Sequence, residues 1–423
     1  MWLFSLTVPP SAGYPLAAKN LLVKFFTIDV TRSGEPQLMR FLRVARKRKL
    51  PLGLLAVLAL VTLAGCTSGN HPQSTLAPKG DYAEMVDGLF MTTVYLATFV
   101  FIVVEGALLW AIFRFRGKPT DPDPEQSHGN TLVEIIWTVV PAVVLAIVAV
   151  PTVKTIFATA KVPTSSADGK APLKVEVIGH QWWWEFRYPE LGITTANELH
   201  VPVGRTIDLR MKSFDVIHSF WIPQFAGKRD VFPNRETRLW FTAKTAGAYP
   251  GACAEFCGLQ HGRMDFYLMA DTPEAFAAWQ SNRMADTMLA ATGMPKPPPK
   301  PDTTAAAGGA KTPGAAVIPA PAAAPLGVAD AQIAEGMKLF QTKGCIGCHT
   351  SSAMTPMKGM VGPNLSGIGS RRMIAAGWLP NSDENLKRWL HDPQAVKKGV
   401  GMIIPPLTDV EVNALVAYLR TKR

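Results

Sequence analysis

The stretch Cys253-Ala-Glu-Phe-Cys257-Gly-Leu-Gln-His261-Gly-Arg-Met264 places two thiols, an imidazole and a thioether within twelve residues. A second imidazole, His218, lies upstream, after an apolar run of residues typical of β-strands. Sulfur and imidazole ligands suit copper, whereas magnesium and calcium prefer oxygen. Two cysteines four residues apart around a glycine-containing turn can aim at one point and could bridge two copper ions. The pattern therefore predicts a copper site suited to electron transfer.

A disulfide bond and a structural zinc site are the alternatives for this stretch. A disulfide explains Cys253 and Cys257 but assigns nothing to His261 or Met264. A structural zinc site with these donors would need two cysteines and two histidines, and it has little use for a thioether. Copper accounts for all the donors, so we favour copper.

The same residues carry a specific resemblance. The pattern Cys-x-Glu-x-Cys-Gly-x-x-His-x-x-Met, preceded by Asp215-Val-Ile-His218, resembles the binuclear copper A site of cytochrome c oxidase subunit II. The resemblance implies five side-chain ligands and one main-chain carbonyl: His218, Cys253, Cys257, His261, Met264 and the carbonyl of Glu255. It also implies that the Glu255 carboxylate helps hold a magnesium ion shared with subunit I, and that Asp215 lies on the surface facing cytochrome c.

Residues 172–270 should form the all-β domain that carries this site. Leu173–Ile178 and Ile207–Met211 alternate apolar and polar side chains, and turn residues separate the runs. This predicts a small antiparallel barrel or sandwich, and the resemblance implies a cupredoxin-like fold. The loop 253–264 should join two strands at one end, with His218 arriving from a neighbouring strand.

His180-Gln-Trp182-Trp183-Trp184 is an aromatic cluster within this domain. Alternate side chains of a strand face opposite ways, so at least one of the three tryptophans should be exposed. The run resembles the family segment whose first tryptophan receives electrons from cytochrome c, and this role falls on Trp182. The family pattern usually has tyrosine at the position of Trp183.

The first 65 residues are interpreted as a leader. They contain nine Lys/Arg and two acids, which is most of the net charge of +11, so the charge does not indicate nucleic-acid binding. Residues 39–65 combine a basic run, a short apolar core and a lipobox-like Leu63-Ala64-Gly65-Cys66, which predicts a lipoprotein signal peptide with Cys66 lipidated. An ordinary signal peptide with a chance cysteine is the alternative. Residues 1–38 precede Met39 and are interpreted as a possible over-extension of the gene.

Residues 66–160 should form a membrane hairpin with spans at about 88–113 and 131–157, each long enough for a helix to cross the hydrocarbon layer. The basic run from Arg114 to Lys118 places that end in the cytoplasm by the positive-inside rule. The expected location is the bacterial cell (inner) membrane, multi-pass, with both cofactor domains on the outer, periplasmic face. Glu134 matches the family glutamate at the mouth of a proton path into subunit I, although a carboxylate favoured by the helix dipole is the alternative.

Cys345-Ile-Gly-Cys348-His349 opens a last domain at 328–423. C-x-x-C-H is the motif for covalent haem c, with two thioether bonds and an iron-ligating histidine. Redox or zinc chemistry of the thiols is the alternative, but the export signal and the helices expected at 331–342 and 409–419 favour an all-α class I cytochrome c. Residues 291–327, rich in proline and alanine, should be a linker from the copper domain at 161–290.

The distal iron ligand has five methionine candidates: Met354, Met357, Met360, Met373 and Met402. We choose Met402 because it precedes the last helix, where the distal methionine of the cytochrome family lies, although two isoleucines separate it from Pro405. Methionine opposite histidine raises the iron potential. Gly362-Pro363 resembles the family turn whose proline carbonyl orients the haem histidine.

The sequence is thus identified as a member of the cytochrome c oxidase subunit II family with a fused cytochrome c, as in caa-type haem–copper oxidases. The resemblance implies electron flow from haem c through copper A to haem a, haem a3 and copper B in subunit I, with dioxygen reduced and protons pumped. Subunit III and an external cytochrome c or bc complex are further expected partners. The five cysteines are then fully assigned: one to lipid, two to copper and two to haem.

Other classes of protein use parts of this pattern. A nitrous oxide reductase needs a large propeller domain, for which the chain has no room. A copper chaperone usually has a thioredoxin-like α/β pattern, which residues 172–270 do not show. The small subunit of a copper-A nitric oxide reductase and a membrane-tethered electron carrier remain as alternatives.

Overall fold

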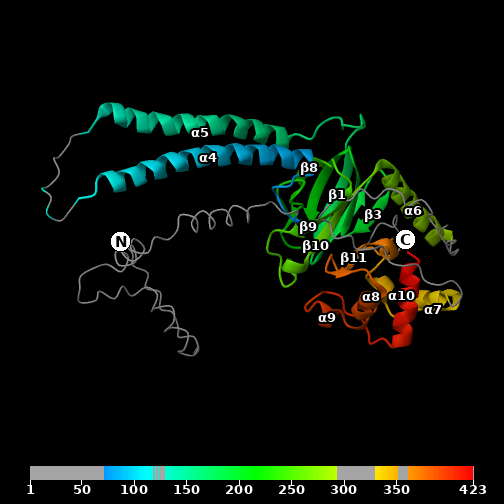
Figure 1. Cartoon of the computed structure of the whole chain (residues 1–423). Coiled ribbons are helices and arrows are strands. Elements are labelled where there is room, and N and C mark those ends of the chain that lie inside the picture. The colour runs from blue at the N-terminus through cyan, green and yellow to red at the C-terminus, as the bar shows by residue number, and fades with distance from the viewer. Residues whose placement is uncertain are drawn as a thin grey trace, which may run out of the picture. The chain divides into compact units, whose positions relative to one another are not determined.

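The computed structural model describes residues 71–117, 129–292, 329–350 and 361–422, together with Thr120 and Pro122 (Figure 1). Several predictions from the sequence lie outside these residues: the leader, the lipidation of Cys66, the linker from residue 293 on, and Met354, Met357 and Met360.

Two long helices, α4 (Asp81–Arg114) and α5 (Thr131–Ala160), are long and apolar enough to cross a membrane, and they contact each other (Figure 1). Each is longer than the span predicted from hydropathy, and α4 begins seven residues earlier. Its first turn is polar and packs on protein, with Tyr82 buried and edge-on to Trp240 at 5.8 Å. Hydropathy detects only the apolar part of the helix, so it missed this turn.

One strand of the following domain, β8 (Thr237–Thr242), is hydrogen-bonded to the start of α4 and to the end of α5. The Asp81 carboxylate at the start of α4 accepts from the Thr242 N–H at 2.7 Å. The Trp240 indole N–H donates to the Thr159 carbonyl at the end of α5 at 2.9 Å. The start of the first helix and the end of the second therefore attach to the same strand.

The β-domain is a sandwich of two five-stranded sheets, with orders β3-β2-β1-β5-β8 and β4-β10-β9-β6-β7. Its other strands are β1 (Leu173–His180), β2 (Trp183–Tyr188), β3 (Ile193–Ala196), β4 (Glu198–Pro202), β5 (Thr206–Ser213), β6 (His218–Trp221), β7 (Arg229–Val231), β9 (Gly247–Cys253) and β10 (Asp265–Asp271). The inner faces carry the core, in which Trp184, Phe186, Phe220 and Phe266 are fully buried. The cupredoxin-like all-β class predicted from the sequence is confirmed.

The pairing within the sheets differs from a purely antiparallel prediction. β1 pairs with β5 in parallel, and so does β4 with β10. In both parallel pairs the chain crosses to the other sheet between the two strands, whereas the other six pairs of the sandwich are antiparallel. The ligand loop joins β9 to β10 as predicted, and His218 opens β6, which is the neighbour of β9.

A further helix, α6 (Pro273–Thr292), packs against β3, β4 and β10 of the sandwich. In the described residues of the last domain, 329–350 and 361–422, there are four α-helices, two 3-10 turns and two short strands. They are α7 (Ala329–Thr342), η2 (Cys345–Gly347), η3 (Ile368–Ser370), β11 (Met373–Ile374), β12 (Leu379–Pro380), α8 (Asp383–His391), α9 (Pro393–Val396) and α10 (Asp409–Arg420). A Cβ at Gly336 of α7 would lie 2.0 Å from the Ala414 carbonyl oxygen, so only glycine lets α7 and α10 pack this closely.

Candidate functional site

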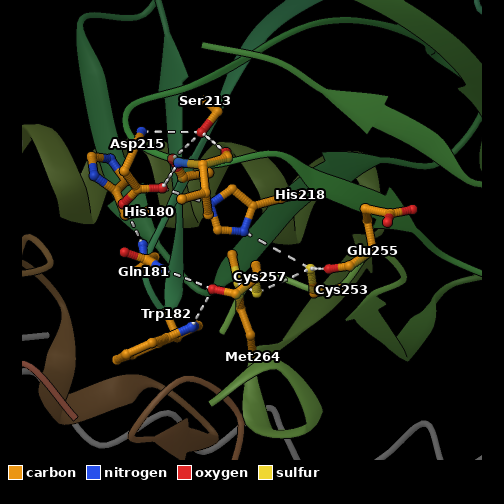
Figure 2. Close-up of polar contacts among 12 residues, drawn as sticks. His180, Gln181, Trp182, Ser213, Asp215, His218, Cys253, Glu255, Cys257 and Met264 are labelled. Carbon is orange, nitrogen blue, oxygen red and sulfur yellow. Dashed lines mark hydrogen bonds and ion pairs between the residues drawn. The ribbon is translucent and has the colours of Figure 1, made fainter. Parts of the chain in front are cut away.

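The loop between β9 and β10 gathers the sulfur and imidazole donors (Figure 2). The two thiol sulfurs, Cys253 Sγ and Cys257 Sγ, are 3.8 Å apart. His218 Nδ1 lies 3.9 Å from the first sulfur, and His261 Nδ1 lies 3.7 Å from the second. Met264 Sδ is 3.8 Å from Cys257 Sγ. The five predicted side-chain donors are therefore linked by contacts of 3.7–3.9 Å, and the two sulfurs are not joined in a disulfide bond.

Four of the five donor side chains are shielded from water, and only that of His261 is half-buried. His218 and Met264 are fully buried, and both thiols are nearly so. The main-chain carbonyl of Glu255 lies 3.3 Å from Cys253 Sγ, while the Glu255 carboxylate is exposed to solvent. The chemistry of this set fits two soft metal ions that share the thiolates, and the carbonyl is the sixth donor that the resemblance implied.

The two thiols ionise unequally because they lie so close together. The hydrogen bond with Cys257 lowers the pKa of Cys253, and His218 lowers it further. The pKa of Cys257 is raised, because a second thiolate would lie beside the first and away from water. A doubly charged thiolate pair therefore needs cations beside it, and metal ions supply them.

Asp215 fixes the orientation of His218, one of the predicted ligands (Figure 2). Asp215 Oδ1 lies 2.8 Å from His218 Nε2, which leaves Nδ1 facing the thiols. Burial alone would lower the pKa of His218, but the bonds to Asp215 and Cys253 outweigh it and raise the pKa overall. The other oxygen of Asp215 accepts from the Gln181 N–H at 2.6 Å. One carboxylate thus joins a predicted copper ligand to the residue that precedes Trp182.

Trp182 is hydrogen-bonded to the main chain of Cys257, one of the predicted ligands. Its indole N–H donates to the Cys257 carbonyl at 2.9 Å, and the Gln181 side-chain amide donates to the same oxygen at 2.7 Å (Figure 2). The expectation that one tryptophan of the cluster is exposed was wrong. Trp182 is half-buried, and Trp183 is buried in a stack on His180 and in a cluster with Ala376 of the last domain. Strand alternation cannot reveal that a second domain covers the outer face.

The C-x-x-C-H motif lies at η2, where neither Cys345 nor Cys348 forms a disulfide bond. His349 Nδ1 donates to the Pro363 carbonyl at 2.8 Å, which leaves Nε2 for an iron ion. A Cβ at Gly362 would lie 2.5 Å from His349 Cε1, so glycine is required beside the ring. Burial lowers the pKa of His349, which favours the neutral, ligating imidazole. These features fit a covalently bound haem.

Met402 is placed where a second ligand to that haem could come from. It precedes α10 and packs, half-buried, against the core cluster that also contacts Cys345. Its carbonyl accepts from the Gln394 side-chain amide at 3.2 Å, which holds the loop.

Glu134 lies apart from both centres, in the first turn of α5 after the cap Asn130, and its side chain is exposed.

Two functional features escaped the sequence analysis. The resemblance placed Asp215 on a docking surface, whereas its hydrogen bonds run inward to His218 and Gln181. Lys397 had no predicted role, yet it is buried against the ligand loop. A histidine three residues after an aspartate was a possible signal for the first feature, and no signal existed for the second.

Comparison with known proteins agrees with this geometry. Three family profiles match in order: "Cytochrome C oxidase subunit II, transmembrane domain" at 77–155, "Cytochrome C oxidase subunit II, periplasmic domain" at 191–270, and "Cytochrome c" at 333–422. Cytochrome c oxidase subunit 2 of Alkalihalophilus pseudofirmus is 33% identical over 376 residues, covering 88% of this chain and 96% of the relative. The same subunit of Bacillus sp. is 34% identical over 380 residues, covering 86% and 95%. Among solved structures, the periplasmic domain of subunit II of cytochrome oxidase from Bradyrhizobium japonicum is 30% identical, with a TM-score of 0.27, covering 30% of this chain and 98% of that chain.

Proposed function

Because the chain belongs to the cytochrome c oxidase subunit II family, we propose that its ligand loop and C-x-x-C-H motif hold the two centres through which electrons enter the oxidase. The chain is subunit II of a haem–copper oxidase complex that contains subunit I, and it carries a fused cytochrome c domain. Its two cofactor-bearing domains are of the copper A and haem c types. The nitric oxide reductase and free electron carrier alternatives are not favoured by relatives named for cytochrome c oxidase.

Copper A and haem c, when bound, supply one-electron carriers to this chain. We assign copper A to His218, Cys253, Glu255 (through its carbonyl), Cys257, His261 and Met264, and haem c to Cys345, Cys348, His349 and Met402. One observation carries the copper assignment: neighbouring donor atoms of the thiols, imidazoles and thioether lie no more than 3.9 Å apart. The burial of this set keeps water away and limits reorganisation during electron transfer.

Trp182 is the residue through which electrons should reach the copper site, because its indole N–H contacts the carbonyl of the ligand Cys257. Trp182→Phe removes that hydrogen bond and keeps most of the ring. We expect copper reduction by the haem domain to slow, while the copper spectrum stays unchanged. Trp183→Phe is the matched control, because the Trp183 indole N–H has no hydrogen-bond partner among the described residues. Equal rates in the two variants would argue against this role.

The helix ends support the membrane topology that we propose. The start of α4 and the end of α5 are bonded to the same strand, which supports a hairpin with two spans and both cofactor domains on the outer face. Arg114 and Arg116 lie at the other end of α4, as the positive-inside rule requires for a cytoplasmic turn. Glu134 begins α5 at that end, which fits a proton-path entrance into subunit I.

A magnesium ion shared with subunit I is proposed at Glu255. The Glu255 carboxylate is exposed and therefore free to reach a partner, while its carbonyl faces the copper loop. Glu255→Gln should lower the magnesium content of the purified complex and leave its copper content unchanged, because the carbonyl is retained. Loss of copper together with magnesium would contradict the division of roles.

The external donor, a cytochrome c or a bc complex, and subunit III are also proposed as partners.

A tethered haem domain stays at roughly millimolar effective concentration, so it can bind the copper domain weakly and release it quickly. A chain lacking residues 330–423 should keep its copper but depend on added soluble cytochrome c for turnover. Unchanged turnover with the native donor would oppose the relay.

Purification from membranes with metal analysis tests the whole proposal. We expect two copper ions and one covalent haem per chain, together with a large haem-bearing partner. Zinc in place of copper, or a chain that purifies without such a partner, would refute it.

A further inference from the structure

Lys397, in the loop that follows α9, is buried in a contact with the copper ligand loop. It is 1% exposed. Its Nζ donates to the Arg263 carbonyl at 2.6 Å and to the Ala375 carbonyl at 2.9 Å. Arg263 directly precedes the ligand Met264, whereas Ala375 belongs to the cytochrome domain. A single lysine therefore bridges the two domains through main-chain oxygens.

Two more hydrogen bonds flank this bridge along the ligand loop. The side-chain amide of Gln260, next to the ligand His261, donates to the Lys398 carbonyl. The N–H of Asp265 donates to the Ala376 carbonyl at 3.1 Å. Neighbours of the proposed ligands His261 and Met264 are thus hydrogen-bonded to the cytochrome domain.

Side-chain packing continues the contact. The Arg263 guanidinium lies 4.3 Å from the centre of the Trp378 ring. A Cβ built on Gly399 would lie 3.6 Å from Leu259 Cβ. The contact therefore runs along the second half of the loop, from Leu259 to Asp265, and it is not a single polar bond.

The chemistry of Lys397 makes it the central member of this contact. An amino group is costly to bury without hydrogen-bond acceptors, and here two main-chain carbonyls accept from two of its three N–H donors. One of these carbonyls is in the copper domain, so this hydrogen bond forms only while the two domains are in contact. The same loop continues to Met402, the proposed haem ligand, five residues further on.

We propose that Lys397 is a positioning residue that fixes the cytochrome domain on the copper ligand loop for electron transfer between the two centres. This inference rests on the proposed function. One electron leaves the reduced haem iron and enters the oxidised copper pair, and no covalent bond forms or breaks. The contact holds the two domains in one arrangement. Because the contacting groups are buried between the domains, the contact limits how far the two centres move apart.

The test compares Lys397→Met with Lys387→Met in the purified complex. Lys387 is an exposed lysine on α8 of the same domain, so its substitution removes the same charge without a buried contact. Electrons are injected into haem c by pulse radiolysis, and the copper absorption is followed. We expect transfer to slow by about tenfold in Lys397→Met, the loss that corresponds to about 1.4 kcal/mol of docking free energy, and to be unchanged in Lys387→Met. Equal rates in the two variants would overturn the proposal.

Copper content, haem content and both absorption spectra separate positioning from misfolding, because they should not change in Lys397→Met. Absence of transfer in the unmodified protein would refute the proposed function instead. If Lys397→Met loses haem, a second variant tests the domain contact instead. It carries both Leu259→Cys and Gly399→Cys, whose Cβ separation of 3.6 Å suits a disulfide. Mass spectrometry should find this cross-link and not one between Leu259→Cys and Gly401→Cys, where a Cβ would have no neighbour within 4 Å. A missing 259–399 cross-link would overturn the proposal.

Discussion

Asp215 Oδ1 lies 2.8 Å from His218 Nε2, and the opposite nitrogen of that imidazole faces the thiol of Cys253. A carboxylate behind a ligating histidine fixes the ring and raises the basicity of the ligand. Burial is the largest influence on Asp215 and would raise the pKa of its carboxyl, but bonds from His218 and two main-chain N–H groups lower it overall. The carboxylate is therefore ionised at neutral pH, where it can support the histidine.

Asp215→Asn should weaken copper binding by about tenfold, the lower end of the usual effect of losing such a partner. The amide keeps the shape of the side chain but not its charge, so the ring loses electrostatic support. Copper titration of the metal-free protein and the electron paramagnetic resonance spectrum measure the effect. Glu236→Gln, an exposed acid of the same domain, is the control. If the two variants bind copper equally, the support does not come from the Asp215 charge.

Met264→Leu should change the copper spectrum and potential and leave the haem absorption unchanged. Leucine fills the buried space without offering a sulfur to the metal, and Met264 Sδ lies 3.8 Å from Cys257 Sγ. Met269→Leu, in the adjoining strand, is the control because its sulfur is not among the donors. Loss of both copper and haem signals in Met264→Leu would indicate a folding defect and not a lost ligand.

The sequence was sufficient for the metal-ligand loop but not for what surrounds it. Cys253 to Met264 are close in the chain, so their spacing alone predicts that they meet. The bond from Gln181 to Asp215 spans 34 residues, and the bond from Lys397 to Arg263 spans 134. Such pairs depend on sheet order and domain contact, which periodicity does not encode.

Gly362→Ala should disturb the haem histidine without preventing haem attachment. The added methyl group would lie 2.5 Å from His349 Cε1, so the ring or the Pro363 turn must move. We expect altered haem absorption and a shifted iron potential, measured by redox titration. Gly347→Ala is the control, because a Cβ there has no neighbour within 4 Å. A normal spectrum in Gly362→Ala would show that the histidine tolerates displacement.

The stability of the copper domain should depend on the ionisation of His200. Its Nδ1 lies 2.8 Å from Asp271, its Nε2 lies 3.7 Å from Glu198, and its ring stacks on Trp279 at 4.6 Å. Burial alone would lower the pKa of His200, but the bonds to the two carboxylates outweigh burial and raise the pKa overall. A raised pKa in the folded state means that protonation stabilises the fold.

This stabilisation is complete below the unfolded pKa of about 6.5 and is lost as the pH rises through the higher folded value. His200→Gln should therefore lower the free energy of unfolding by about 1 kcal/mol at pH 6, and the difference from the unmodified protein should shrink at pH 9. Denaturant unfolding followed by tryptophan fluorescence measures both values. His71→Gln, at an exposed position outside the sandwich, is the control. A difference that stays constant from pH 6 to pH 9 would mean that His200 contributes through packing on Trp279 and not through its charge.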